Sequence, residues 1–275
     1  MAGEADKAKR TRFRDLHADG LFLMPNAHDP GTAQLLASLG FPALATTSAG
    51  FAFTRALPDG GVPFEMMIAH AKEMAASTTL PVSADLERGK GDSPESAGET
   101  VFAAEAAGLA GCSIEDHTGD PARPIYEFAH AVERVAAASG AARAFSHGFT
   151  LTARAEDLLW GGTLDEAVRR LQAFEEAGAD VLFAPGLDME GVRVVMSAVT
   201  KPLSVLATPD MRVDELRTLG VRRISVGSKL ATAAFGAVRR AAGAMLGEGR
   251  FDWAREGMGF DELQTLFAPN AVRAD

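Results

Sequence analysis

Acidic side chains gather at two places that each follow a short apolar run. Asp85 and Glu87 end one run, and Glu115 and Asp116 end the next. In an extended strand, residues two apart point to the same side, so Asp85 and Glu87 are expected to face one way. Carboxylates brought together repel each other unless a cation or a proton lies between them. Hard oxygen ligands without a His or Cys cluster predict Mg²⁺, with Mn²⁺ also possible, instead of zinc.

Two further segments have residue types suited to binding an anion. Arg154 follows an apolar run and offers a planar fork for a carboxylate or phosphate, although it could instead neutralise the acidic residues. Thr47, Ser48 and Ala49 belong to a stretch of small residues whose backbone N–H groups can approach an anion closely. A simple tight turn is the plainer interpretation of that stretch.

The other nucleophiles and metal-ligand types give weaker signals. The single cysteine, Cys112, excludes an intrachain disulfide, and its place early in an apolar run predicts a core thiol. The six histidines show no metal-ligand spacing, and only His28 and His117 fall near the ends of expected strands. A net charge of −10 argues against nucleic-acid binding, and no apolar run is long enough for a membrane span. We therefore expect a cytoplasmic protein.

Short apolar runs alternate with longer amphipathic runs along the whole chain. The expected strands are 21–24, 43–46, 82–85, 112–114, 150–153, 181–184, 203–206 and 223–226. The expected helices are 32–39, 64–77, 94–107, 125–138, 164–177, 190–199, 213–219 and 230–246. Four of these helices are followed by a glycine that can adopt the left-handed cap and lead the chain into the next strand. These glycines are Gly40, Gly108, Gly178 and Gly220.

This alternation predicts a parallel sheet covered by helices. Eight strand-and-helix units in 275 residues favour an α/β fold of the (β/α)₈ TIM-barrel type, built as one domain over residues 1–275. A doubly wound open sheet is the alternative, but the expected glycine-rich dinucleotide turn does not follow the first strand. In a barrel, functional residues lie where strands end, which is where Asp85, Glu115 and Arg154 stand.

Several motifs, in order and spacing, resemble the isocitrate lyase/phosphoenolpyruvate mutase superfamily, which includes phosphonomutases and 2-methylisocitrate lyases. They are Pro25-Asn26-Ala27-His28-Asp29, Thr46-Thr47-Ser48-Ala49-Gly50, Pro58-Asp59-Gly60, Pro81-Val82-Ser83-Ala84-Asp85-Leu86-Glu87, Ile114-Glu115-Asp116, Thr152-Ala153-Arg154 and Glu176-Ala177-Gly178-Ala179-Asp180. The resemblance covers roughly residues 21–233.

The resemblance implies a barrel of the phosphoenolpyruvate/pyruvate type and a small 2-oxo acid or phosphonate substrate. It also implies a homo-oligomer, dimer or tetramer, in which the eighth helix packs against a neighbouring subunit, and a C-terminal helical extension over about 247–275. Asp85 would bind Mg²⁺ directly, whereas Asp59, Glu87 and Glu115 would hold the water molecules of the metal. The substrate would contact Thr47, Ser48, Ala49 and Arg154. Asp59, Glu115 and Arg154 would be the catalytic residues.

The chain also departs from this superfamily in the segment after Asp116. Isocitrate-type lyases carry a cysteine-containing loop there, whose cysteine is the catalytic acid, whereas this chain has His117-Thr118-Gly119-Asp120-Pro121. The leading prediction is a Mg²⁺-dependent enzyme that cleaves or forms a C–C or C–P bond beside a 2-oxo acid, through an enolate. An oxaloacetate decarboxylase-like activity and a non-catalytic 2-oxo acid-binding protein are the alternatives.

Overall fold

Eight parallel strands form the centre of the computed structural model, which describes residues 3–268. Each expected strand is present, and its ends lie within one residue of the predicted ones. The strands are β1 (Phe22–Leu23), β2 (Leu44–Ala45), β3 (Val82–Asp85), β4 (Gly111–Glu115), β5 (Thr150–Arg154), β6 (Val181–Phe183), β7 (Leu203–Leu206) and β8 (Arg223–Ser225).

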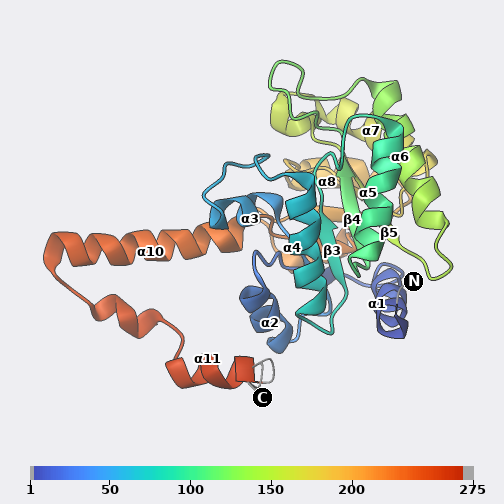
Figure 1. Ribbon diagram of the computed structural model, residues 1–275. Helices are drawn as coiled ribbons and strands as arrows, with labels where there is room; N and C mark the ends of the chain where they lie inside the picture. The colour runs from blue at the N-terminus through green and yellow to red at the C-terminus, as the bar shows by residue number, and fades with distance from the viewer. Residues whose placement is uncertain (1–2, 269–275) are drawn as a thin grey trace.

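The strands pair in the cyclic order of a barrel. Continuous parallel pairing runs β1-β8-β7-β6-β5-β4-β3-β2. The gap between β1 and β2 is bridged just beyond β1, where Asn26 pairs in parallel with Ala45. There the Ala45 N–H donates to the Pro25 carbonyl at 2.9 Å, and the Ala27 N–H donates to the Ala45 carbonyl at 2.8 Å. The predicted (β/α)₈ barrel is therefore confirmed (Figure 1).

Helices surround the strands, and the eight expected helices are present. They are α2 (Pro30–Ser38), α4 (Phe64–Ala76), α5 (Pro94–Ala106), α6 (Phe128–Arg143), α7 (Leu164–Glu176), α8 (Met189–Ala198), α9 (Val213–Thr218) and α10 (Lys229–Glu248). The helical segments that the sequence patterns did not predict individually are α1 (Glu4–Leu16), α3 (Ser48–Thr54), η1 (Asp157–Trp160), η2 (Asp252–Glu256) and α11 (Phe260–Phe267).

The four glycines that follow helices act as predicted. The φ angles of Gly40, Gly108, Gly178 and Gly220 are 88°, 84°, 102° and 86°. In this left-handed region only glycine avoids steric strain, so each residue ends its helix and turns the chain toward the next strand.

The apolar core lies between the strands and the helices, and a smaller cluster fills the amino-terminal end of the barrel. In that cluster Phe13 of α1 packs with Phe22, Met24 and Ala43, so α1 covers this end. Cys112 is fully buried in the core between strands and helices, as its position in an apolar run predicted. The opposite end of the barrel, where the strands terminate, remains open to ligands.

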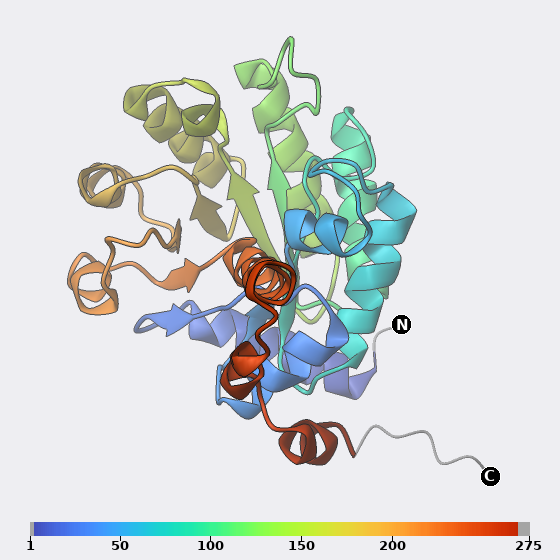
Figure 2. The ribbon, with the colours of Figure 1, turned by 90° about the vertical axis from the view of Figure 1, so that its left-hand side faces the viewer.

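Helix α10 projects away from the barrel. Figure 2 shows it end-on, with the other helices arranged in a ring around the strands. Within α10 only Ala231 is buried. After α10, η2 and α11 follow, and α11 lies near α2. Part of the predicted extension, residues 269–275, lies outside the described residues. No helix within residues 3–268 is long and apolar enough to cross a membrane.

Candidate active site

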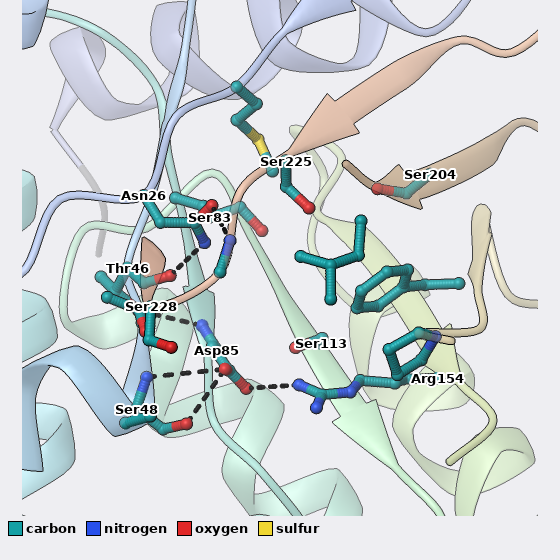
Figure 3. A pocket seen from close by; sticks show the side chains of 18 of the residues that line it. Asn26, Thr46, Ser48, Ser83, Asp85, Ser113, Arg154, Ser204, Ser225 and Ser228 are labelled. Carbon is teal, nitrogen blue, oxygen red and sulfur yellow. Dashed lines mark hydrogen bonds and ion pairs between the residues drawn. The ribbon is translucent and has the colours of Figure 1, made fainter. Parts of the chain in front are cut away.

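A cavity of about 170 Å³ opens at the carboxyl ends of the strands (Figure 3). Side chains from β3, β5 and the start of α3 meet there, although they are far apart in the sequence. The predicted substrate-binding residues Thr47, Ser48, Ala49 and Arg154 all line this cavity, together with Asp59 and Asp85. The barrel thus brings most of the predicted site residues together around one small volume.

Asp85 lies at the centre of the polar contacts. Its Oδ2 accepts a hydrogen bond from the Ser48 hydroxyl at 3.0 Å and a longer one from the Ser48 backbone N–H at 3.5 Å. Its Oδ1 accepts from Arg154 Nη1 at 3.3 Å. The backbone N–H of Asp85 donates to the Thr46 hydroxyl at 2.9 Å, which fixes the end of β3. Both carboxylate oxygens of Asp85 therefore face the cavity mouth.

Arg154 joins the acidic residues of three neighbouring segments. Its guanidinium forms ion pairs with Asp85 at 3.3 Å, with Glu115 at 3.4 Å and with Glu156. Burial opposes its charge, but these carboxylates outweigh burial and raise the pKa of Arg154 well above its ordinary value. Arg154 also lies over the Phe183 ring, 5.4 Å from the ring centre. This geometry is compatible with both roles considered for Arg154, namely binding an anion and neutralising the acidic cluster.

The small residues around Ser48 form the start of helix α3 instead of a simple tight turn. The Thr47 hydroxyl accepts a hydrogen bond from the Gly50 N–H at 3.1 Å and so caps the helix. The first N–H groups of a helix have no partner within the helix. The N–H of Ser48 makes only the long contact with Asp85 at 3.5 Å, and Ala49 lines the cavity beside it. The anion-binding interpretation of this stretch thus gains a helix end.

The carboxyl groups at the mouth outnumber the positively charged side chains near them. Burial, followed by Asp85, Glu115 and Asp59, raises the pKa of Glu87 to about 8. Partial burial, and then Asp85 and Glu115, also raise the pKa of Asp59, which lines the cavity. Glu87 has a φ of 51°, a conformation that L-residues rarely adopt. One arginine does not balance this many carboxylates, so the mouth favours a further cation.

A second, outer cavity continues from the first toward solvent. Glu87, Glu115, Glu156, His117 and Trp160 line it. The ring of His117 stacks on Trp160 at 4.8 Å between ring centres, and its Nδ1 lies 3.6 Å from Glu115 Oε1. This contact with Glu115 is the main cause that raises the pKa of His117. Its Nε2 is buried and has no hydrogen-bond partner within residues 3–268.

Some residues that the sequence suggested lie elsewhere. Asp116 does not face the mouth with Glu115, because adjacent strand residues point in opposite directions. Instead, its carboxylate pairs with Arg170 at 3.1 Å and accepts from the Glu156 N–H at 2.8 Å. His28 is buried beside Asp29 and lines neither of the two cavities described here.

The sequence analysis did not identify two residues of the site, Glu156 and Arg223. Glu156 comes after β5 has ended, where alternation no longer predicts direction, yet its side chain faces Arg154. Burial raises the pKa of Glu156 to about 7, and Glu115 adds to the shift while Arg154 opposes it. Arg223 begins β8 and lines the floor of the inner cavity. An arginine within the expected strand 223–226 is the signal that could have identified it.

The described residues contain no cluster of three or more His, Cys, Asp or Glu side chains arranged as direct ligands of one metal ion. Asp85 and Glu115 are instead joined through Arg154 Nη1. Such a set of separated carboxylates fits an ion that keeps most of its own water molecules, as Mg²⁺ does. It does not fit zinc, which requires four close ligands in structural sites and three in catalytic ones.

Comparison with known proteins identifies the family of this chain. The family model of phosphoenolpyruvate phosphomutase matches residues 13–246. The protein named "Probable 2-methylisocitrate lyase 2" from Corynebacterium glutamicum is 31% identical over 255 residues, which cover 86% of this chain and 81% of that protein.

Solved structures show the same relationship. One from Burkholderia cenocepacia J2315, broadly described as a lyase/mutase, has a TM-score of 0.94 and 45% identity, and the match covers 97% of this chain and 98% of that one. Phosphonopyruvate hydrolase in complex with oxalate and Mg²⁺ has a TM-score of 0.85 and 25% identity, and the match covers 95% of each chain. The chain therefore belongs to the phosphoenolpyruvate phosphomutase family of enzymes, which confirms the resemblance found in its sequence motifs.

Proposed function

We propose that this protein is a Mg²⁺-dependent enzyme that cleaves or forms a C–C or C–P bond next to a 2-oxo acid. One observation supports this most strongly: Asp85 lies between Ser48 and Arg154 at the end of the barrel, with both carboxylate oxygens at the mouth of a small cavity. Family membership adds relatives named as a 2-methylisocitrate lyase and a phosphonopyruvate hydrolase.

Asp85 is the residue proposed to bind Mg²⁺ directly. Asp59, Glu87 and Glu115 would hold water molecules of the ion, which is consistent with their separation and with the raised pKa of Glu87 and Asp59. Mn²⁺ prefers similar oxygen ligands and is a possible substitute. When bound, the ion supplies positive charge that polarises the 2-oxo group and stabilises negative charge on its oxygen.

The chain itself supplies groups that orient the substrate. We propose that Arg154 donates to the substrate carboxylate, because its planar fork matches that group and it already lines the cavity. The N–H groups of Ser48 and Ala49, at the start of α3, are proposed to face the 2-oxygen. Donors fixed in place before the reaction stabilise developing negative charge more effectively than mobile ones. Asp59, Glu115 and Arg154 then form the proposed catalytic set.

His117 is proposed to handle the proton that isocitrate-type relatives manage with a cysteine. Its unpartnered Nε2, its contact with Glu115 and its position on the outer cavity support this role. We expect His117→Gln to lower kcat far more than it changes KM. An equal effect on both, or no effect, would show that another group carries the proton.

A substrate screen tests the proposed function. Phosphonopyruvate, oxaloacetate, 2-methylisocitrate and 2,3-dimethylmalate are each supplied with and without Mg²⁺, and the products are identified by mass spectrometry. We expect turnover of at least one compound only with Mg²⁺, and none with Asp85→Ala. Turnover of oxaloacetate to pyruvate alone would identify the decarboxylase-like alternative. Mg²⁺-dependent binding of these acids without any turnover would instead indicate a non-catalytic relative.

We also propose that the protein forms a homo-oligomer in which α10 packs against a neighbouring subunit. Helix α10 projects from the barrel and exposes large apolar side chains, including Phe235, Val238 and Leu246, at 49%, 67% and 91%. Exposed apolar surface of this kind marks interaction sites in soluble proteins. Light scattering after size-exclusion chromatography should show a dimer or tetramer, and Val238→Asp should shift it toward the monomer. A monomeric wild-type protein would contradict this assignment.

A further inference from the structure

A buried arginine crosses the interior of the barrel below the proposed active site. Arg223 begins β8 and is only 3% exposed. Its Nε donates to the Ser204 hydroxyl on β7 at 2.9 Å, and its Nη2 donates to the Thr152 hydroxyl on β5 at 3.0 Å. Because β5 lies three strands away from β8 in the sheet order, the side chain must extend across the interior. Its guanidinium therefore forms part of the cavity floor.

The charge of Arg223 has no counter-ion among the described residues. Its third contact is with the imidazole of His17, whose Nε2 lies 3.3 Å from Nη1. The Nδ1 of His17 lies 2.8 Å from the Phe13 carbonyl, so Nδ1 carries the hydrogen and Nε2 accepts from Arg223. Burial, and then Arg223 itself, lower the pKa of His17 to about 3, so this ring is neutral. Burial lowers the pKa of Arg223 to about 9, which still leaves it charged at neutral pH.

Hydrogen-bond donors around this floor are left without protein partners. A guanidinium has five N–H groups, and the three contacts described leave two of them free. The hydroxyls of Ser83 and Ser225 line the same cavity and make no side-chain hydrogen bond with residues 3–268. Both serines are buried, at 5% and 6% exposure. The Ser204 hydroxyl accepts from Arg223 and keeps its own hydrogen to donate. Figure 3 shows these three serines around the cavity.

An uncompensated cation in a buried site is costly, and buried charges are normally paired. At the mouth of the cavity Arg154 already has three carboxylate partners, whereas the floor has donors and one positive charge but no acid. We propose that Arg223, with the hydroxyls of Ser83, Ser204 and Ser225, forms a subsite for one compact anionic group. The group is of carboxylate or halide size, because the whole cavity measures about 170 Å³.

Two sources could supply this group. One is free halide; the other is a second acidic group on a ligand whose first carboxylate contacts Arg154. Arg154 and Thr152 are two residues apart on β5, about 6.6 Å along the strand, so a short diacid can reach from the mouth to the floor. Neither source requires turnover, and so this subsite can be tested whether or not the proposed reaction is correct.

The halide arm of the test measures thermal unfolding of the metal-free protein at constant ionic strength. Sodium chloride is exchanged for sodium gluconate, whose anion is too large for the floor. If halide binds, wild-type Tm should be about 2–5 °C higher in chloride at concentrations well above Kd. Arg223→Met should lose this difference. The neighbouring Arg222→Met should retain it, because the polar partners of Arg222 within residues 3–268 are the Gly20 carbonyl and Asp19, away from the cavity.

The diacid arm measures binding by calorimetry in gluconate with Mg²⁺ present. Malate is compared with 2-hydroxybutyrate, which has a methyl group in place of the second carboxylate. If the ligand supplies the anion, the wild-type protein should prefer malate by at least about tenfold, as a charge-assisted hydrogen bond provides. Arg223→Met should lose the preference, and Arg222→Met should keep it. A positive result in either arm supports the subsite and identifies the source of the anion.

The proposal is overturned if wild-type protein and Arg223→Met respond equally to chloride and show the same ratio of malate to 2-hydroxybutyrate affinity. Circular dichroism establishes that each variant is folded. If Arg223→Met fails to fold, Ser204→Asp provides a second test, because position 204 contacts Arg223 Nε directly and the new carboxylate would be a built-in anion. Ser204→Asp should be insensitive to chloride and lose the malate preference. If Ser204→Asp keeps the chloride effect or the malate preference that the wild-type protein shows, the proposal is overturned.

Discussion

Removing the charge of Arg154 is expected to destabilise the metal-free protein strongly and in a pH-dependent way. The side chains involved are largely buried: Arg154 is 18% exposed, Asp85 20%, Glu115 7% and Glu156 6%. Breaking a buried ion pair by removing one partner costs about 3–5 kcal/mol, because the remaining charge is left without compensation. We expect Arg154→Met to lower the free energy of unfolding by about that amount at pH 8.

The loss should be smaller at pH 5. Burial already raises the pKa of Glu156 to about 7, and Arg154 opposes this shift, so removing the guanidinium raises that pKa further. An acid with a raised folded-state pKa binds more protons in the native state, so its destabilising effect disappears at low pH and grows as pH rises through that pKa. Saturating Mg²⁺ should restore part of the lost stability at pH 8, because it supplies positive charge to the same carboxylates.

Urea unfolding followed by circular dichroism at pH 5 and pH 8 measures both effects. Arg193→Met is the matched control, because Arg193 pairs with Glu190 at the surface, where both side chains are more than half exposed. Exposed pairs contribute about 0–1 kcal/mol, so this control should change little at either pH. A loss below about 1 kcal/mol for Arg154→Met at pH 8, or an equal loss at both pH values, would refute the proposed electrostatic role.

Four further predictions test the site. Asp85→Ala should abolish Mg²⁺ binding in calorimetry without unfolding the protein, since the other carboxylates are proposed to reach the ion only through water; unchanged affinity would contradict the assignment. Oxalate should inhibit only with Mg²⁺, and Arg154→Lys should weaken its binding by about 1.5–3 kcal/mol because the two-pronged fork is lost; equal inhibition without Mg²⁺ would count against a shared pocket. Thiol alkylation should leave activity unchanged, because burial raises the pKa of Cys112 to about 12; substrate-protected inactivation would place this thiol in the site. Metal-free protein should lose stability from pH 5 to pH 8 in thermal unfolding, because burial raises the pKa of Glu87 to about 8 and of Glu156 to about 7 from 4.5; stability that rises over this range would be inconsistent with protonated carboxyls in the fold.

Local patterns were sufficient to predict the repeated units of the barrel. A strand or helix is recognised by the spacing of its own apolar residues, and each of the eight strands was found within one residue of its expected ends. Gly40 and Gly178 mark helix ends through a backbone requirement that is equally local. Helix α1 was missed, since its charged composition hides the two side chains, Arg10 and Phe13, that the barrel buries.

The residue types that follow each strand can be read from local patterns, and they place Asp85, Glu115 and Arg154 at one end of the barrel. How these side chains meet depends on contacts between distant segments. Asp85 and Arg154 are 69 residues apart, and the pairing of β3 and β5 on either side of β4 is what brings them within 3.3 Å. Side-chain direction beyond the end of a strand no longer follows alternation, so Glu156 turns to Arg154 by local chain geometry. The position of Arg223 depends on partners from three other segments, which no local pattern encodes.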